Sequence, residues 1–108
     1  MRFPKLKPVR SESYRRFVAT HPCFACGITG FSQAAHPNHG RGLGQKASDL
    51  DCFPLCAPRF GLMGCHAQHD QLVDLSLAER RELEKQYTAR MRFLARAAGR
   101  AELLKEAA

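Results

Sequence analysis

Four cysteines of this chain are spaced in a way that suits a metal ion. Cys23 and Cys26 form a C-x-x-C pair, and Cys56 and Cys65 follow as a second pair. Four thiolates are a common tetrahedral ligand set for a structural zinc ion. The eight residues inside the second pair exceed the usual two to four, but a longer loop adds closure entropy only slowly. We predict a structural Zn²⁺ site; the alternative is a set of buried, apolar cysteines.

A second group of side chains, two histidines and an aspartate, could bind a catalytic metal ion. His66 directly follows Cys65, and Asp70 comes four residues later, so a helix would place His66 and Asp70 on one face. His69, three residues after His66, could take the place of Asp70. Imidazole nitrogen and carboxylate oxygen suit Mg²⁺, Mn²⁺ or Zn²⁺ and leave coordination positions open for water and phosphate.

His36 and Asp49 are assigned to the same candidate site because each borders a predicted strand between the two cysteine pairs. The strands are expected over residues 31–36 and 50–55, so His36 closes the first and Asp49 precedes the second. A lone histidine is more often a surface or core side chain than a ligand, which is the alternative for every histidine in this set.

The elements that must position these residues are short. Ser11 is expected to cap a helix over residues 11–19, on which Tyr14, Phe17 and Val18 share one face. The other predicted elements of this half are a metal-binding turn at 23–27, a glycine-rich loop at 40–46, a loop at 57–64 and a helix at 65–73.

The last third of the chain is predicted to be helical. Ser76 and Glu79 form a capping box at its start. The apolar residues that follow recur at helical spacing and form one stripe: Leu83, Tyr87, Met91, Leu94 and Ala98. Gly99 is expected to end this helix, with a short helix after it. The chain then divides into an extended basic leader, a zinc-containing domain and a helical extension packed on the core, at residues 1–10, 11–74 and 75–108.

Composition limits the class of protein. The chain has 108 residues, of which 44% are hydrophobic and 25% charged, as in a single soluble domain. No apolar run approaches about 18 residues, and the N-terminus lacks a signal-peptide pattern, so we expect a cytoplasmic protein without a membrane span. A reducing compartment favours metal binding over disulfides. The fifth cysteine, Cys52, is assigned to the core.

The formal net charge of +7 is concentrated at the N-terminus. Residues 1–22 hold six basic side chains and one acidic side chain. Such a basic arm suits a polyanion such as DNA, whose phosphates supply most of the non-specific affinity. The alternative is that the charge serves solubility alone.

Taken in order, these motifs resemble the HNH, or ββα-metal, nuclease superfamily, and most closely its small phage and prophage members associated with recombination. The resemblance covers about residues 14–72 and is carried by Cys23-x-x-Cys26-Gly27, Ala35-His36, Gly42-x-Gly44-x-Lys46-Ala47-Ser48-Asp49, Pro54-Leu55-Cys56 and Cys65-His66-x-x-x-Asp70. It implies an α+β fold: a small zinc-stapled ββα-metal core with a flanking N-terminal helix and a long C-terminal helix.

The resemblance also implies residue roles. His36 would be the general base that activates water, a task for which an imidazole is suited. Asp49 would position His36 or assist the metal. His66, with Asp70 or His69, would hold a catalytic Mg²⁺ or Mn²⁺, with Zn²⁺ as an alternative ion. The residues expected to contact DNA are Arg10, Arg15, Arg16, Arg41 and Lys46.

The sequence departs from the family pattern in three places. Ala35 stands where many members have a second His or Asp, which removes one metal ligand; residues 57–64 form an insertion within the second cysteine pair; and the last helix offers both His69 and Asp70 as the third ligand. The predicted function is a metal-dependent DNA endonuclease or nickase of HNH type. The alternative is a non-catalytic, zinc-stapled nucleic-acid-binding accessory protein of a phage or prophage. A third hypothesis is a factor that binds phage or host recombination proteins, or a second copy of itself, through the C-terminal helix.

Overall fold

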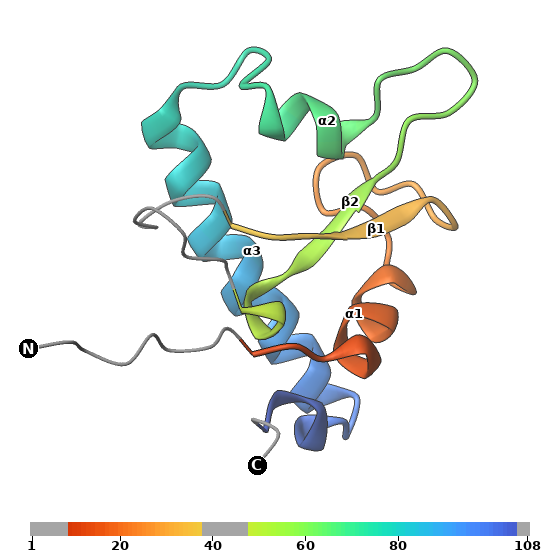
Figure 1. The fold of residues 1–108 in the computed structure, drawn as a ribbon, viewed down its shortest axis with the longest axis vertical. Coiled ribbons are helices and arrows are strands. Elements are labelled where there is room, and N and C mark those ends of the chain that lie inside the picture. Colours follow the sequence, from red (N-terminus) through yellow and green to blue (C-terminus); the bar gives the residue numbers. More distant parts are fainter. Residues whose placement is uncertain (1–8, 38–47, 106–108) are drawn as a thin grey trace, which may run out of the picture.

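The computed structural model describes residues 9–37 and 48–105, in which helices surround a two-stranded antiparallel sheet (Figure 1). The strands are β1, Ser32–Ala35, and β2, Phe53–Cys56. The helices are α1, Glu12–Ala19, α2, Cys65–Asp70, and α3, Leu77–Ala97, with 3₁₀ turns η1, Asp49–Asp51, and η2, Ala101–Leu104. The fold is therefore mixed α and β, as predicted.

The sheet pairs Gln33 with Leu55 and Ala35 with Phe53. All four residues of β2 are buried, whereas β1 buries only Ala35. The second strand begins later than predicted. The Ser48 side chain accepts a hydrogen bond from the backbone N–H of Leu50, and this cap turns residues 49–51 into a 3₁₀ turn.

Helix α1 forms where it was predicted because Ser11 caps it, its hydroxyl accepting from the Tyr14 backbone N–H at 3.2 Å. Tyr14 and Val18 are fully buried against the sheet, and Phe17 packs beside them. The apolar face predicted for this helix is therefore the face that packs on the core.

Helix α3 starts at the predicted capping box, in which Ser76 and Glu79 exchange both hydrogen bonds. Met91 and Ala95 are completely buried, and Tyr87 is half-buried on the same core. Figure 1 shows α3 running the length of the molecule beside the sheet. The helical extension therefore completes the core of the domain rather than standing apart from it.

The end of the helix predicted over residues 65–73 also shifts. Helix α2 ends at Asp70 instead of continuing to residue 73, because Leu72 and Asp74 have φ angles of 56° and 53°, which no helix accommodates. The 57–64 loop forms as predicted. No helix in the described ranges is long and apolar enough to cross a membrane.

Candidate metal centre

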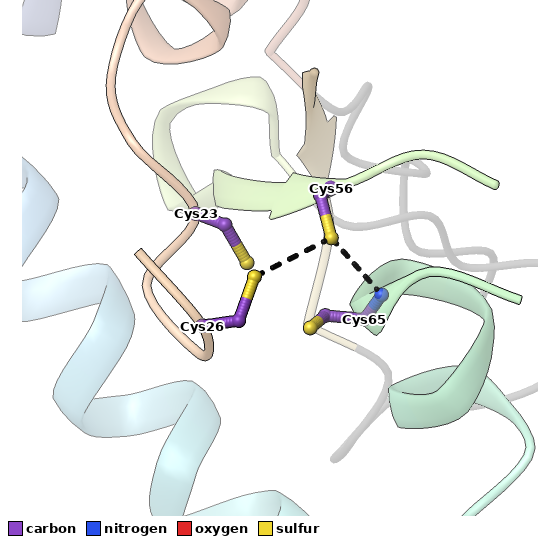
Figure 2. A group of neighbouring side chains, drawn as sticks. All are labelled: Cys23, Cys26, Cys56 and Cys65. Carbon is purple, nitrogen blue, oxygen red and sulfur yellow. Dashed lines mark hydrogen bonds between the residues drawn. The ribbon is translucent and has the colours of Figure 1, made fainter. Parts of the chain in front are cut away.

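Four cysteine thiols meet between the turn before β1, the end of β2 and the start of α2 (Figure 2). Their sulfur atoms, from Cys23, Cys26, Cys56 and Cys65, all lie within 4.8 Å of one another. The sulfur atoms of Cys26 and Cys56 are 3.8 Å apart. A tetrahedral site with Zn–S bonds of about 2.3 Å places its sulfurs about 3.8 Å apart, so the donor set fits a metal ion such as Zn²⁺.

Backbone hydrogen bonds hold the C-x-x-C turn in place. Gly27 donates to the Cys23 carbonyl at 2.8 Å and has a φ of 82°, a left-handed conformation that glycine adopts without strain. Phe24 donates to the Pro54 carbonyl at 3.0 Å and so ties the turn to β2. The first cysteine pair is therefore attached to the strand that carries the third ligand.

The second pair is joined by the 57–64 loop, whose closure depends on one glycine. Gly64 has a φ of 82°, and a Cβ atom there would lie 2.6 Å from the carbonyl carbon of Ala57. This close backbone approach brings Cys65 back to Cys56, and the Cys65 N–H donates to the Cys56 sulfur at 3.3 Å.

The pKa values of two thiols in this cluster, those of Cys56 and Cys65, shift in opposite directions. Burial alone would raise the pKa of Cys56, but the Cys65 N–H and the Arg59 guanidinium outweigh it and lower that pKa to about 6. Burial and hydrogen bonds to neighbouring thiols raise the pKa of Cys65. Cys56 is therefore ionised more readily than Cys65, which favours Cys56 as a metal ligand.

His36 and Asp49 lie together at the end of the sheet away from the cysteines. Nε2 of His36 is 2.8 Å from Oδ1 of Asp49. Asp49 is only 1% exposed, and its other oxygen accepts from the Ser11 N–H at 2.7 Å and from Arg15 Nε at 3.1 Å. Burial opposes ionisation, but these donors and His36 outweigh it and lower the pKa of Asp49. Asp49 is thus a buried carboxylate that orients a partly exposed histidine.

His66 and Asp70 share one face of α2, as predicted. Nε2 of His66 lies 3.6 Å from Oδ2 of Asp70, and Nδ1 of His66 lies 2.9 Å from Oε1 of Gln33 on β1. When Nδ1 donates to Gln33, Nε2 is the nitrogen left to bind a metal. The side chains of His66 and Asp70 are 25% and 49% exposed, so water and a ligand can reach them.

His69 lies apart from this pair. It is 6% exposed, its Nε2 is 3.0 Å from Oε2 of Glu84 on α3, and its ring packs against Phe53. The interpretation of His69 as a ligand interchangeable with Asp70 therefore needs correction, because it faces the α2–α3 contact. Within residues 9–37 and 48–105, the four cysteines are the only group of three or more potential ligands that meets.

Sequence reasoning missed three residues of this region: Gln33, Arg59 and Glu84. Glu84 was detectable, because it precedes the buried Met91 and Ala95 by seven and eleven residues and so lies on the same stripe of α3. Gln33 and Arg59 carried no comparable signal, since their partners are set by strand register and by the fold of a loop.

The basic residues predicted to contact DNA have varied surroundings. Arg10 and Arg15 approach Asp49 with about half of each side chain exposed. Arg16 pairs with Glu12 on the surface of α1. Arg41 and Lys46 lie outside the described residues.

The chain is similar to a protein family and to part of one longer protein. Residues 1–103 match a family described as "Protein of unknown function (DUF968)". A protein of Escherichia coli (strain K12), "Uncharacterized protein YdfU", is 40% identical over 57 residues, which cover 52% of this chain and 16% of that protein. The match therefore spans much less than two thirds of that relative's length. No solved structure matches the chain significantly.

Proposed function

We propose that this chain, which belongs to the DUF968 family of unknown function, is a metal-dependent DNA endonuclease or nickase of HNH type. The proposal includes a structural Zn²⁺ bound by Cys23, Cys26, Cys56 and Cys65. It rests on the resemblance of the motifs and on the way in which the side chains around the sheet are oriented.

The observation that carries the proposal is the His36–Asp49 pair. When Nε2 of His36 donates to Asp49, Nδ1 carries the lone pair that can accept a proton from water. Asp49 is held by Ser11 and Arg15, so the imidazole is oriented by a fixed carboxylate. The His36 side chain is 31% exposed, which leaves it accessible to water.

The direction of α2 supports a common site for His36 and for the face of α2 that carries His66 and Asp70. Cys65 starts the helix beside Cys56, and His69 packs against Phe53, the strand partner of Ala35. The helix therefore runs back along β2. Asp70 lies one turn, about 6 Å, beyond His66, toward the end of the sheet that His36 follows.

In the proposed reaction, His36 removes a proton from the attacking water, and Asp49 stabilises the imidazolium that forms. His66 and Asp70 would hold a divalent ion, whose chemistry would be to neutralise charge at the scissile phosphate and at the departing 3′-oxygen. Gln33 keeps His66 in the tautomer whose Nε2 can act as a ligand.

The test is nicking of supercoiled plasmid DNA by the zinc-loaded protein in Mg²⁺ or Mn²⁺. His36→Ala should lower the rate at least a hundredfold, the usual minimum contribution of a general base, while DNA binding is retained. His21→Ala is the matched control, because His21 lies at the end of α1 and bonds only with neighbours along the chain. Wild-type protein that cleaves no DNA with any divalent ion would refute the proposal.

A second candidate, a non-catalytic DNA-binding protein, is favoured by one observation. Ala35 is buried and offers no donor, so His66 and Asp70 are the two protein ligands available on that face of α2. DNA binding without cleavage, and without any effect of His36→Ala, would identify this function instead.

A further inference from the structure

The loop between Cys56 and Cys65 exposes apolar side chains at its tip. Phe60 is 89% exposed and Leu62 is 59% exposed, whereas most large apolar residues within 9–37 and 48–105 are at least half-buried. Figure 1 shows the loop, drawn in green between β2 and α2, projecting beyond the rest of the domain. An exposed aromatic side chain on a projecting loop suggests a binding surface.

Phe60 stands at the surface of this loop in a hydrogen-bonded turn. Arg59 and Leu62 exchange two backbone hydrogen bonds, of 3.1 and 2.7 Å, and form a tight turn with Phe60 in it. Phe60 has a φ of 49°, an uncommon conformation for an aromatic residue. The two ends of the loop are Cys56 and Cys65, whose sulfur atoms meet in the cysteine cluster.

Phe60 forms a continuous surface with a second aromatic ring, that of Phe31, and with the guanidinium group of Arg59. Phe31 lies edge-on to Phe60, with ring centroids 6.2 Å apart, and is itself 37% exposed. The Arg59 guanidinium lies over the Phe31 ring, 5.0 Å from its centroid. We call Phe31, Arg59 and Phe60 the aromatic tip. Aromatic rings beside an arginine form the kind of platform on which nucleic-acid bases stack.

The charge of the surrounding sequence selects an anionic partner. Residues 13–48 and 52–69, which include all four metal-binding cysteines and the aromatic tip, contain no Asp or Glu. Arg15 and Arg16 are paired with Asp49 and Glu12, so Arg59 is the basic side chain at the tip itself, in a chain whose formal net charge is +7. A partner that combines negative charge with a flat apolar face is a nucleic acid rather than a typical protein surface.

We propose that the aromatic tip stacks on an unpaired base, so that this protein prefers DNA with a single-stranded branch or tail over uninterrupted duplex. Bases within a duplex are already stacked on one another, so only unpaired bases offer a face to Phe60. This inference rests on the proposed function, in that DNA is the ligand, and it specifies the substrate class.

The experiment compares two fluorescent DNA probes, a duplex with a single-stranded tail and a blunt duplex of equal length. Binding is measured by anisotropy with zinc-loaded protein and no added Mg²⁺ or Mn²⁺. Phe60→Ala should weaken binding to the tailed probe roughly tenfold, the effect of losing one stacked base, and leave binding to the blunt duplex unchanged. Phe60→Trp should restore the preference, because its ring can stack.

Phe93→Ala is the matched control, since Phe93 is also exposed, at 66%, but lies on α3. Both variants should retain the metal content of the wild type. Equal affinity of wild type and Phe60→Ala for the tailed probe would overturn the inference, while leaving the proposed nuclease intact. Wild-type protein that binds neither probe would overturn both.

Discussion

The Asp49 side chain joins three separate parts of this small domain. Its carboxylate receives a backbone N–H from the start of α1, a guanidinium from Arg15 and the imidazole of His36, while remaining 1% exposed. A buried carboxylate is stable only when it is paired in this way. The same contacts that keep Asp49 ionised therefore orient His36, so structure and proposed chemistry depend on one side chain.

Asp49→Asn should lower the free energy of unfolding by about 2 kcal/mol at pH 7, because hydrogen bonds to a buried charge are lost. Arg15 is 45% exposed, so its share is reduced by solvent. Since folding lowers the pKa of Asp49 from 3.8, its contribution is complete above that pH and is lost as pH falls through the lowered value. Denaturant unfolding of wild type and variant from pH 7 to pH 2 measures this.

Asp51→Asn provides the comparison for this measurement, because Asp51 pairs with Arg92 but is 34% exposed. Its effect should be below about 1 kcal/mol, as for other exposed ion pairs. A stability difference for Asp49→Asn that persists unchanged at pH 2 would contradict the assignment of ionised Asp49 as the stabilising group.

At the scale of elements, α2 has only six residues, and an isolated helix of that length is not stable in water. Its first residue is Cys65, its later residues pack on Phe53 and Glu84, and no side chain caps its start. The cysteine cluster would therefore supply, on binding a metal ion, the stability that so short a helix lacks. It also attaches the Cys56–Cys65 loop and the His66–Asp70 face to one rigid point.

Cys65→Ser, or removal of metal by a strong chelator, should abolish tetrahedral thiolate coordination and disorder α2 together with the loop. Substituted Co²⁺ reports the coordination through its visible absorption, and metal analysis should give one ion per wild-type chain. Cys52→Ala is the control, since Cys52 is fully buried in the core outside the cluster. A Cys65→Ser protein that still binds one tightly held ion would contradict the assignment.

At the scale of the whole molecule, α3 makes a single unit out of segments that are too small to fold separately. The two-stranded sheet, α1 and η2 all contribute to one core with Met91 and Ala95 of α3. Two short strands alone are marginal in water. The apolar stripe of α3 was predicted to be either core or partner surface. At Met91 it is core, whereas Phe93, on the opposite side of the helix, is exposed.

Met91→Ala should lower the free energy of unfolding by about 2 to 5 kcal/mol, because it creates a cavity at a position with 0% exposure. Phe93→Ala, two residues away and largely exposed, should change it by less than about 0.5 kcal/mol. Thermal and denaturant unfolding of both variants provide the measurement. Equal losses would contradict the packing of α3 on the core.

The sequence by itself determined the local features of this protein. The Ser11 cap, the Ser76–Glu79 capping box and the apolar face of α1 depend on residues within one or two turns, and all three were predictable. The meeting of the four cysteines was also predictable, because a C-x-x-C pair followed by a second cysteine pair is a common ligand spacing for a metal ion. These features are encoded by neighbours along the chain.

Only the tertiary structure decided how the histidines are used. Residues 66, 69 and 70 are equivalent candidates along a helix, and the choice among them depends on which element lies on each side. Because α3 covers one side of α2, His69 is buried against Glu84, while His66 meets Gln33 on β1. Contacts between distant segments have no sequence period, so the division of these side chains into buried and accessible ones appears only when the chain is folded.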